Sequence, residues 1–393
     1  MKLLNYKHTV TACFIGYMVQ AIVCNFAPLL FVGWSSEFNI SLPQLTSIVT
    51  LTFFTQIVID FISAGFADKI GYKKCLIGAH LFSSIGFLLL GILPYVMKNS
   101  FLGIVISISL YSVGSGLLEV LVSPVVESCP SDNKAGAMSL LHSFYCWGTV
   151  IVIAVSSIFF AFFGRDNWRF LSFAFCIFAL LNGIFFSLVP IIEPEEENKK
   201  TKKENLFKNR FFIIAVILMV CSGAAELAMS QWASSFAETA LGVSKTVGDL
   251  AGPMAFAVLM GTGRIIFSKL SEKIEIRKYL IVSAILCIIS YLIACLSSSP
   301  VIALIGCAIC GFSVSAMWPG TISLTTRKMP NASTAMFAFL AVAGDIGCTT
   351  GPTLIGWITD AMGGSLNKGL IFSIIFPAII IISLLSLKHN KSQ

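Results

Sequence analysis

The sequence predicts an all-α membrane protein with twelve transmembrane helices in two six-helix repeats. Three observations lead to this prediction: an apolar composition, twelve apolar runs that are each long enough to cross a bilayer, and marks that recur in both halves. Hydrophobic residues make up 56% of the 393 residues and charged residues only 11%, whereas soluble domains carry about 25% charged residues. Too few charged side chains remain to cover a water-facing surface. This excludes an ordinary cytosolic enzyme, a secreted domain and a disordered chain.

The twelve apolar runs are read as helices because a spanning helix needs about 20 mostly apolar residues. Strands of a membrane barrel would instead alternate polar and apolar residues in segments of about ten, and these runs do not alternate. In chain order, the predicted spans cover residues 9–34, 42–66, 74–97, 101–127, 136–163, 168–192, 211–237, 248–269, 278–298, 300–325, 334–360 and 368–387.

The positions of Lys and Arg orient these spans, because short cytoplasmic loops carry an excess of both residues. The loops on the side of the N-terminus contain 20 of the 26 Lys and Arg residues, and the loops on the other side contain 5. The remaining one, Arg264, lies within a span. We therefore expect both termini in the cytoplasm of a multi-pass plasma-membrane protein, in a bacterial inner or cell membrane.

One long polar segment, residues 193–210, separates the sixth span from the seventh. Its charge run is typical of a solvated linker, and we expect no nucleic acid to bind there. The predicted domains are therefore an N-terminal six-helix bundle at 1–192, the cytoplasmic linker at 193–210, and a C-terminal six-helix bundle at 211–393.

The two halves share marks in the same order. DKIGYKK at 68–74 follows the second span, and EKIEIRK at 272–278 follows the eighth. Pro124 near the end of the fourth span has a counterpart in Pro319 of the tenth. Parallel six-helix repeats that are related by an axis along the membrane normal describe the major facilitator architecture.

The segment between the second and third spans resembles the loop signature of the major facilitator superfamily. Gly65, then Asp68 and Lys69, then Gly71 and two lysines reproduce its order of glycine, acid, base, glycine and paired bases. Such a segment makes a tight turn, and Asp68 can pair with cations or cap a neighbouring helix N-terminus. The resemblance implies a conformational role, which we also expect for Asp60 and Arg264 at equivalent positions of the two repeats.

Ionisable residues within spans are costly and usually functional. Glu119, Glu226 and Asp345 lie near the middle of their spans, as do Gln20 and Asn25 of the first span. In the superfamily, spans 1, 4, 7 and 10 line a central cavity, so the resemblance implies that Glu119 and Glu226 face this cavity. A carboxylate there can bind hydroxyl groups or take up a proton. Alternatively, neighbouring helices satisfy it and its role is structural.

Aromatic residues accompany these acids in the middle of spans, although tryptophan is more common at membrane interfaces. Flat aromatic faces that stack on C–H-rich rings, with carboxylates and amides that bind hydroxyls, suit a sugar; packing is the alternative. His142 can relay protons or simply bond to a backbone carbonyl. The predicted substrate-binding residues are Gln20, Asn25, Glu119, Tyr145, Trp147, Glu226, Gln231, Trp232 and Trp318. The predicted proton-coupling residues are Glu119, His142, Glu226 and Asp345.

The fourth span resembles that of the fucose-permease-like proton–sugar symporters, whose pattern is G-x-G-x-x-E-(x)₃-N-P. Here the motif runs from Gly114 to Pro124 with Glu119 as its acid, and the seventh span carries a similar G-A-A-E ending in Glu226. The aromatic-Pro pair at 318–319 and the Gly-Asp segment at 344–345 are also similar to that group. Two features depart from the group: Ser123 replaces its Asn, and the first span has no acid, although Asn25 can serve in binding.

These features predict a secondary active transporter that imports a sugar or a similar polar solute with protons by alternating access. Its chemistry is binding and proton transfer, so we expect no enzyme activity and no cofactor. Cys307 and Cys310 form a CxxC inside one apolar run without a second pair or a nearby His, and we expect no metal there. The expected partners are the solute, protons and the lipid bilayer, with a monomer as the functional form.

Two other functions are compatible with parts of this pattern. A proton-coupled exporter of drugs or metabolites with the same fold would also use mid-span acids and aromatics. Against it, Gly148 is followed by Thr149 rather than by the Pro of the antiporter motif. A membrane receptor that does not transport would keep its phenotype when Glu119 is neutralised.

Overall fold

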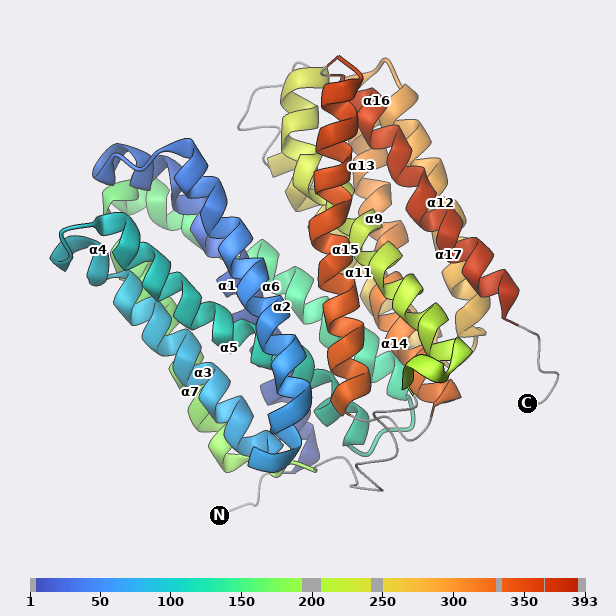
Figure 1. Cartoon of the computed structure of the whole chain (residues 1–393), viewed down its shortest axis with the longest axis horizontal. Helices are drawn as coiled ribbons and strands as arrows, with labels where there is room; N and C mark the ends of the chain where they lie inside the picture. Colours follow the sequence, from blue (N-terminus) through green and yellow to red (C-terminus); the bar gives the residue numbers. More distant parts are fainter. Residues whose placement is uncertain (1–4, 193–205, 242–249, 330–333, 364, 388–393) are drawn as a thin grey trace. The chain divides into compact units, whose positions relative to one another are not determined.

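The computed structural model describes residues 5–192, 206–241, 250–329, 334–363 and 365–387. All regular structure in these residues is helical, which confirms the all-α prediction. The chain forms two compact units (Figure 1): the first is Met1–Ser131 with Phe144–Glu195, and the second is Asp132–Ser143 with Glu196–Gln393. Helix α6 (Lys134–Phe163) therefore contributes its first part to the second unit and its remainder to the first.

The first unit contains the following helices besides the later part of α6: α1 (Tyr6–Phe38), α2 (Leu42–Ile70), α3 (Tyr72–Leu90), α4 (Leu93–Val96), α5 (Ser100–Ser128), η1 (Arg165–Asn167) and α7 (Trp168–Leu188). Sequence signals fix where the first of them begins. Asn5 and His8 form a capping box at the start of α1, which satisfies backbone N–H groups that have no partner within the helix.

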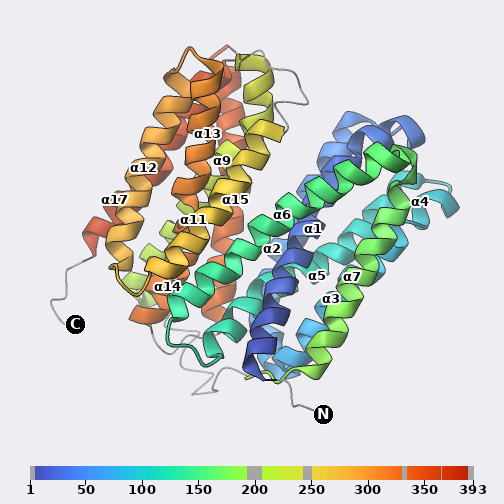
Figure 2. The same cartoon turned by 180° about the vertical axis from the view of Figure 1, so that it is seen from behind.

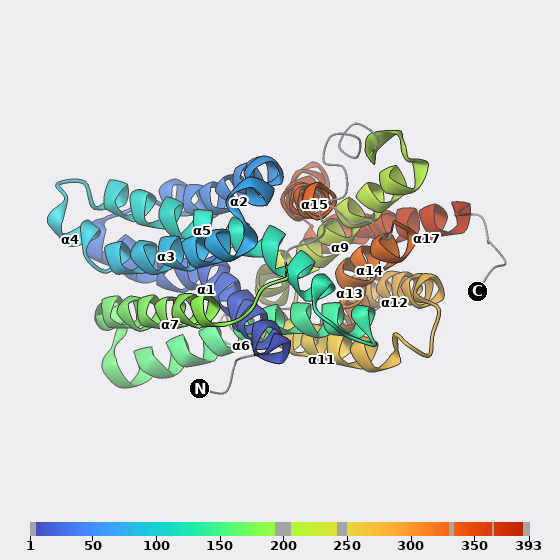
Figure 3. The same cartoon turned by 90° about the horizontal axis from the view of Figure 1, so that it is seen from below.

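Aromatic side chains hold the first unit together. Helix α3 lies between α5 and α7 and packs against both (Figure 3). Phe26 of α1 is fully buried and contacts Phe175 edge-on with ring centroids 5.0 Å apart. Phe87 of α3 and Tyr111 of α5 continue the same core with a centroid distance of 4.9 Å. This packing fixes α1 and α5, which carry the polar residues described below.

The second unit contains, besides the first part of α6, the helices η2 (Leu206–Lys208), α9 (Arg210–Leu241), η3 (Leu250–Met254), α11 (Ala255–Leu270), α12 (Ile276–Leu296), α13 (Pro300–Val314), α14 (Met317–Lys328), α15 (Thr334–Ala361), α16 (Leu366–Ile371), η4 (Phe372–Ile374) and α17 (Ile375–Ser386). Helix α9 packs along α15, and α13 packs against both α12 and α11 (Figure 2).

Ten helical segments among the described residues are long and apolar enough to cross a membrane. Where the sequence predicts the other two spans, the structure has α2, with a shorter apolar stretch at Ser47–Ser63, and α11, which has 16 residues. Large apolar side chains are also exposed on the helix surfaces, for example Phe162 at 80% and Trp357 at 70%. Lipid tails can cover such a surface, so the chain is a multi-pass membrane protein.

The loop signature lies at the junction of α2 and α3. Gly71 ends α2 with a φ of 94°, which favours glycine, and its N–H donates to the Ala67 carbonyl at 2.9 Å. Gly65 and Lys69 are exposed and Asp68 is partly buried. The predicted tight turn is present. Most of the predicted linker, residues 193–205, lies outside the described residues.

Candidate functional site

In the first unit, polar residues lie four apart on each of two packed helices. Helix α2 carries Gln56 and Asp60, and helix α5 carries Ser115 and Glu119. Because residues four apart lie on one helix face, and α2 packs against α5, the two polar pairs meet. Gln20 of α1 reaches the same place. We call these five residues the Glu119 cluster.

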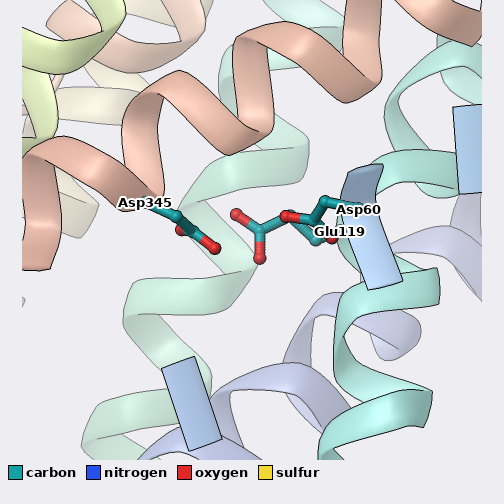
Figure 4. Close-up of side chains that lie close together, drawn as sticks. All are labelled: Asp60, Glu119 and Asp345. Atoms are coloured by element: carbon teal, nitrogen blue, oxygen red, sulfur yellow. The ribbon is translucent and has the colours of Figure 1, made fainter. Parts of the chain in front are cut away.

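Amide groups hold the Glu119 carboxylate. Its Oε2 atom accepts a hydrogen bond from Nε2 of Gln20 at 2.8 Å and from Nε2 of Gln56 at 3.3 Å. The Gln56 amide also donates to Oγ of Ser115 at 3.0 Å. A carboxyl oxygen of Asp60 lies within 4.8 Å of one of Glu119, and Figure 4 shows the two carboxyl groups next to each other.

Burial differs within the Glu119 cluster. The side chains of Gln20, Gln56 and Asp60 are buried, whereas Glu119 is partly exposed. Two ionised carboxylates at this distance repel each other, and one proton on the pair removes the repulsion. The cluster therefore combines an accessible carboxyl group with fixed amide donors, which is the chemistry that proton uptake or hydroxyl binding needs.

The structure brings some of the predicted first-unit residues together. Gln20 donates a hydrogen bond directly to Glu119, and Asp60, which is predicted in a conformational role, lies beside Glu119. Asn25 faces another helix, since its Nδ2 donates to the Ala21 carbonyl at 2.8 Å and to Oγ1 of Thr149 on α6 at 3.2 Å. Tyr145 and Trp147 are half-buried on the first-unit part of α6.

Sequence reasoning missed three polar residues of this region: Gln56, Ser115 and Tyr17. The four-residue spacing of Gln56 from Asp60, and of Ser115 from Glu119, was the signal that could have found the first two. Tyr17 lies one helical turn before Gln20 on α1, and its hydroxyl group is 3.1 Å from Oγ of Ser123. Ser123 replaces the Asn of the fucose-permease pattern, so a neighbouring tyrosine contacts the residue at that position.

A buried ion pair forms the corresponding polar centre of the second unit. Nη2 of Arg264 on α11 lies 3.3 Å from Oε2 of Glu226 on α9, and their side chains are 4% and 12% exposed. Nη1 donates to the His142 carbonyl at 2.8 Å, and Nε donates to the Ser315 carbonyl at 3.1 Å. The Ser139 hydroxyl donates to the Arg264 carbonyl at 2.6 Å. We call these five residues the Arg264 cluster.

This ion pair joins two predictions that the sequence left separate. Glu226 was expected to bind the solute or a proton, and Arg264 was expected in a conformational role; the structure makes them partners. Two charges taken out of water are tolerated when they pair and when the remaining hydrogen-bonding groups are satisfied. Here the remaining N–H groups of the guanidinium donate to backbone carbonyls of α6 and of the α13–α14 junction. The His142 side chain is itself buried.

The other second-unit residues lie on α9, α14 and α15. Asp345 is buried, at 4% exposure, on α15. The Trp318 ring packs directly on Gly344, where an added Cβ would collide with it. Nε1 of Trp232 donates to the Pro352 carbonyl at 3.1 Å, and its neighbour Gln231 is exposed. Trp232 and Trp318 thus both contact α15.

Comparison with known proteins gives consistent matches along the chain. A sequence model of the Major Facilitator Superfamily matches residues 10–352 and 254–390. Membrane protein MosC of Rhizobium meliloti is 24% identical over 277 residues, which are 70% of this chain. The match spans only 65% of that protein's length.

Solved structures share the fold. The transporter FucP in the outward conformation has a TM-score of 0.82 at 16% identity, with coverage of 96% of this chain and 97% of FucP. A variant of the E. coli fucose:proton symporter FucP has a TM-score of 0.81 at 16% identity, with the same coverage of both chains. The proton:xylose symporter XylE has 0.81 at 15% identity, with 96% and 94% covered. At these identities the likeness shows the fold.

Proposed function

Because the chain belongs to the Major Facilitator Superfamily, we propose that it is a secondary active transporter that carries a sugar or a similar polar solute together with protons. The two halves alternate in opening the solute site to either side of the membrane. We propose the architecture that goes with this mechanism: twelve spanning helices in two six-helix repeats at 1–192 and 211–393, joined by a cytoplasmic linker at 193–210. Both termini then lie in the cytoplasm of a monomer in the bacterial cell membrane.

The observation that carries this proposal is the geometry at Glu119. The amide donors of Gln20 and Gln56 both point at Oε2, so a proton on Oε1 leaves both hydrogen bonds in place. Glu119 can therefore change its protonation state while these two hydrogen bonds stay in place. A carboxyl group that is partly exposed and held in this way serves as the proton carrier of a symporter.

The proposed solute class follows from polar and aromatic side chains in each of the two units. Gln20, Asn25 and Glu119 offer amide and carboxyl groups to hydroxyls, with Tyr145 and Trp147 on α6. Trp232 and Trp318 offer ring faces in the second unit, with Glu226 and Gln231 as polar groups. The similar structures FucP and XylE are named as a fucose:proton and a proton:xylose symporter, which favours a sugar. Asp345 and His142 are proposed as further proton-coupling groups.

The loop between α2 and α3 has a proposed conformational role. A short turn at Gly71 couples the two helices, and Asp68 and Lys69 next to it carry charges that can change partners as the helices move. Gly65 precedes them on α2. We propose that this segment, with Asp60, adjusts during the transport cycle rather than binding the solute.

Transport by the purified protein tests the proposal. In proteoliposomes with an inward acid gradient, we expect a radiolabelled monosaccharide or disaccharide to accumulate above its equilibrium level. A gradient of one pH unit supports about tenfold accumulation if one proton accompanies each neutral solute. A protonophore is the control and should abolish the accumulation. Gradient-driven expulsion of a lipophilic cation, without sugar uptake, would contradict the proposal and favour a drug exporter.

A further inference from the structure

The α13–α14 junction in the second unit is a helix interruption with an identifiable cause. Helix α13 ends at Val314 and α14 begins at Met317, with Pro319 in its first turn. In a continuous helix, the N–H of residue 319 would donate to the carbonyl of residue 315. Proline has no N–H, and its ring crowds that same carbonyl. The Ser315 carbonyl therefore lacks its donor from within the helix.

Arg264 supplies a donor to this carbonyl from another helix. Its Nε atom lies 3.1 Å from the Ser315 oxygen, and the residue is 3% exposed. In a membrane, a backbone carbonyl that proline has freed is satisfied by a neighbouring helix, a Ser or Thr side chain, an ordered water or a local change of helix geometry, and here the donor comes from a neighbouring helix. The remainder of the guanidinium is held by the His142 carbonyl and by the Glu226 carboxylate. The three contacts fix the position of the Nε–H group.

Helix α11 can approach the junction this closely because Gly263 precedes Arg264. A Cβ atom on Gly263 would lie 2.8 Å from Cβ of Ser315 and 3.1 Å from the Phe312 carbonyl oxygen, closer than van der Waals contact allows. Any other residue at position 263 would push α11 away from the junction and lengthen the bond from Arg264. Gly263 therefore allows the close approach, and Arg264 supplies the hydrogen-bond donor that the backbone loses at Pro319.

We propose that Arg264 is a positioning residue: its Nε–H replaces the N–H that Pro319 lacks and fixes the α13–α14 junction, which orients Trp318. Trp318 is the residue before Pro319, and its ring packs on Gly344 of α15. Its orientation therefore depends on the backbone between residues 315 and 319. The consequence for solute binding rests on the proposed function, in which Trp318 offers its ring to the solute.

Arg264→Lys isolates the Nε–H group. Lysine has a methylene where arginine has Nε, and its ammonium can still pair with Glu226. Loss of one hydrogen bond from a charged donor predicts about tenfold faster amide hydrogen exchange in peptides that cover residues 315–321. Pro319→Ala restores an N–H at position 319. We expect exchange in Arg264→Lys/Pro319→Ala to return to the rate of Pro319→Ala alone.

Controls keep this test decisive. Thr262→Ala, next to Gly263 on α11, removes a hydroxyl that bonds within its own helix to the Val258 carbonyl, and should leave exchange at the junction unchanged. Gly263→Ala should raise the exchange rate as Arg264→Lys does, and adding Pro319→Ala should lower that rate again. Gly263→Ala and Gly263→Ala/Pro319→Ala replace the Arg264→Lys variants in the test if Arg264→Lys does not fold. Unchanged exchange in the single variants, or no reversal by Pro319→Ala, would overturn the proposal.

A second readout separates this proposal from the proposed function. For a sugar that the wild type transports, Arg264→Lys should raise KM for exchange more than it lowers the maximal rate, and Pro319→Ala should restore KM. The hydrogen-exchange result needs no solute, so it stands whatever the protein transports. One outcome is that Arg264→Lys speeds hydrogen exchange, Pro319→Ala reverses this effect, and KM does not change. That outcome would support Arg264 as the donor to Ser315 and contradict solute binding at Trp318.

Discussion

Replacing Glu119 with glutamine is expected to abolish uphill transport while solute exchange across the membrane continues. The glutamine carbonyl can still accept the bonds that Gln20 and Gln56 now donate to Oε2, so the geometry of the cluster survives. What is lost is the group that binds and releases a proton. Accumulation driven by an acid gradient should fall to the equilibrium level, and counterflow of labelled solute should persist.

Glu37→Gln is the matched control for this prediction. Glu37 lies in the same unit, is exposed, and accepts hydrogen bonds from Tyr95 at 2.6 Å and Trp168 at 3.0 Å. Its replacement makes the same chemical change away from the Glu119 cluster and should leave accumulation intact. Normal accumulation by Glu119→Gln would contradict its role as proton carrier. Loss of both accumulation and counterflow would assign Glu119 to solute binding instead.

The Glu226–Arg264 pair is expected to produce the largest loss of stability on single substitution. Glu226→Gln leaves a buried guanidinium without its counter-charge, and arginine cannot release its proton. Breaking a buried pair from one side costs about 3–5 kcal/mol. The double variant Glu226→Gln/Arg264→Gln buries no charge, so it should be more stable than Glu226→Gln. Thermal unfolding in detergent measures the order.

The exposed pair of Lys278 and Glu275 is the control for burial. Its atoms are 3.1 Å apart, closer than in the Glu226–Arg264 pair, but the side chains are 70% and 40% exposed. Exposed ion pairs contribute about 0–1 kcal/mol, so Glu275→Gln should barely change the unfolding temperature. If Glu226→Gln behaved like Glu275→Gln, or if the double variant were the least stable, the account of the second-unit centre would be wrong.

The helical fold could be predicted from the sequence because long apolar runs leave few alternatives in a bilayer. Among the described residues, helices lie in the predicted spans, and ten segments there meet the length and composition of a crossing helix. Helices α2 and α11 each carry one ionisable residue along their apolar part, Asp60 in one and Arg264 in the other. Asp60 belongs to the Glu119 cluster, and Arg264 forms the ion pair of the Arg264 cluster.

The partners within each cluster could not be predicted, because contacts between distant helices leave no local trace in one sequence. Glu226 and Arg264 are 38 residues apart. Each stands out in the sequence as an ionisable residue within a span, but nothing in the sequence pairs them. The interruption at Pro319 was visible in the sequence as a proline within a span, but the side chain that satisfies Ser315 comes from a helix 51 residues earlier. Gln56 and Ser115 are the exceptions, because their four-residue spacings from Asp60 and Glu119 are visible in the sequence.

Proton movement that accompanies the solute tests the central claim most directly. With a pH-sensitive dye outside proteoliposomes, addition of a transported sugar should make the external medium more alkaline with the wild type. The same addition should give no pH change with Glu119→Gln, although labelled sugar still exchanges. Alkalinisation of equal size in both would contradict the account, because the proton would then enter without Glu119.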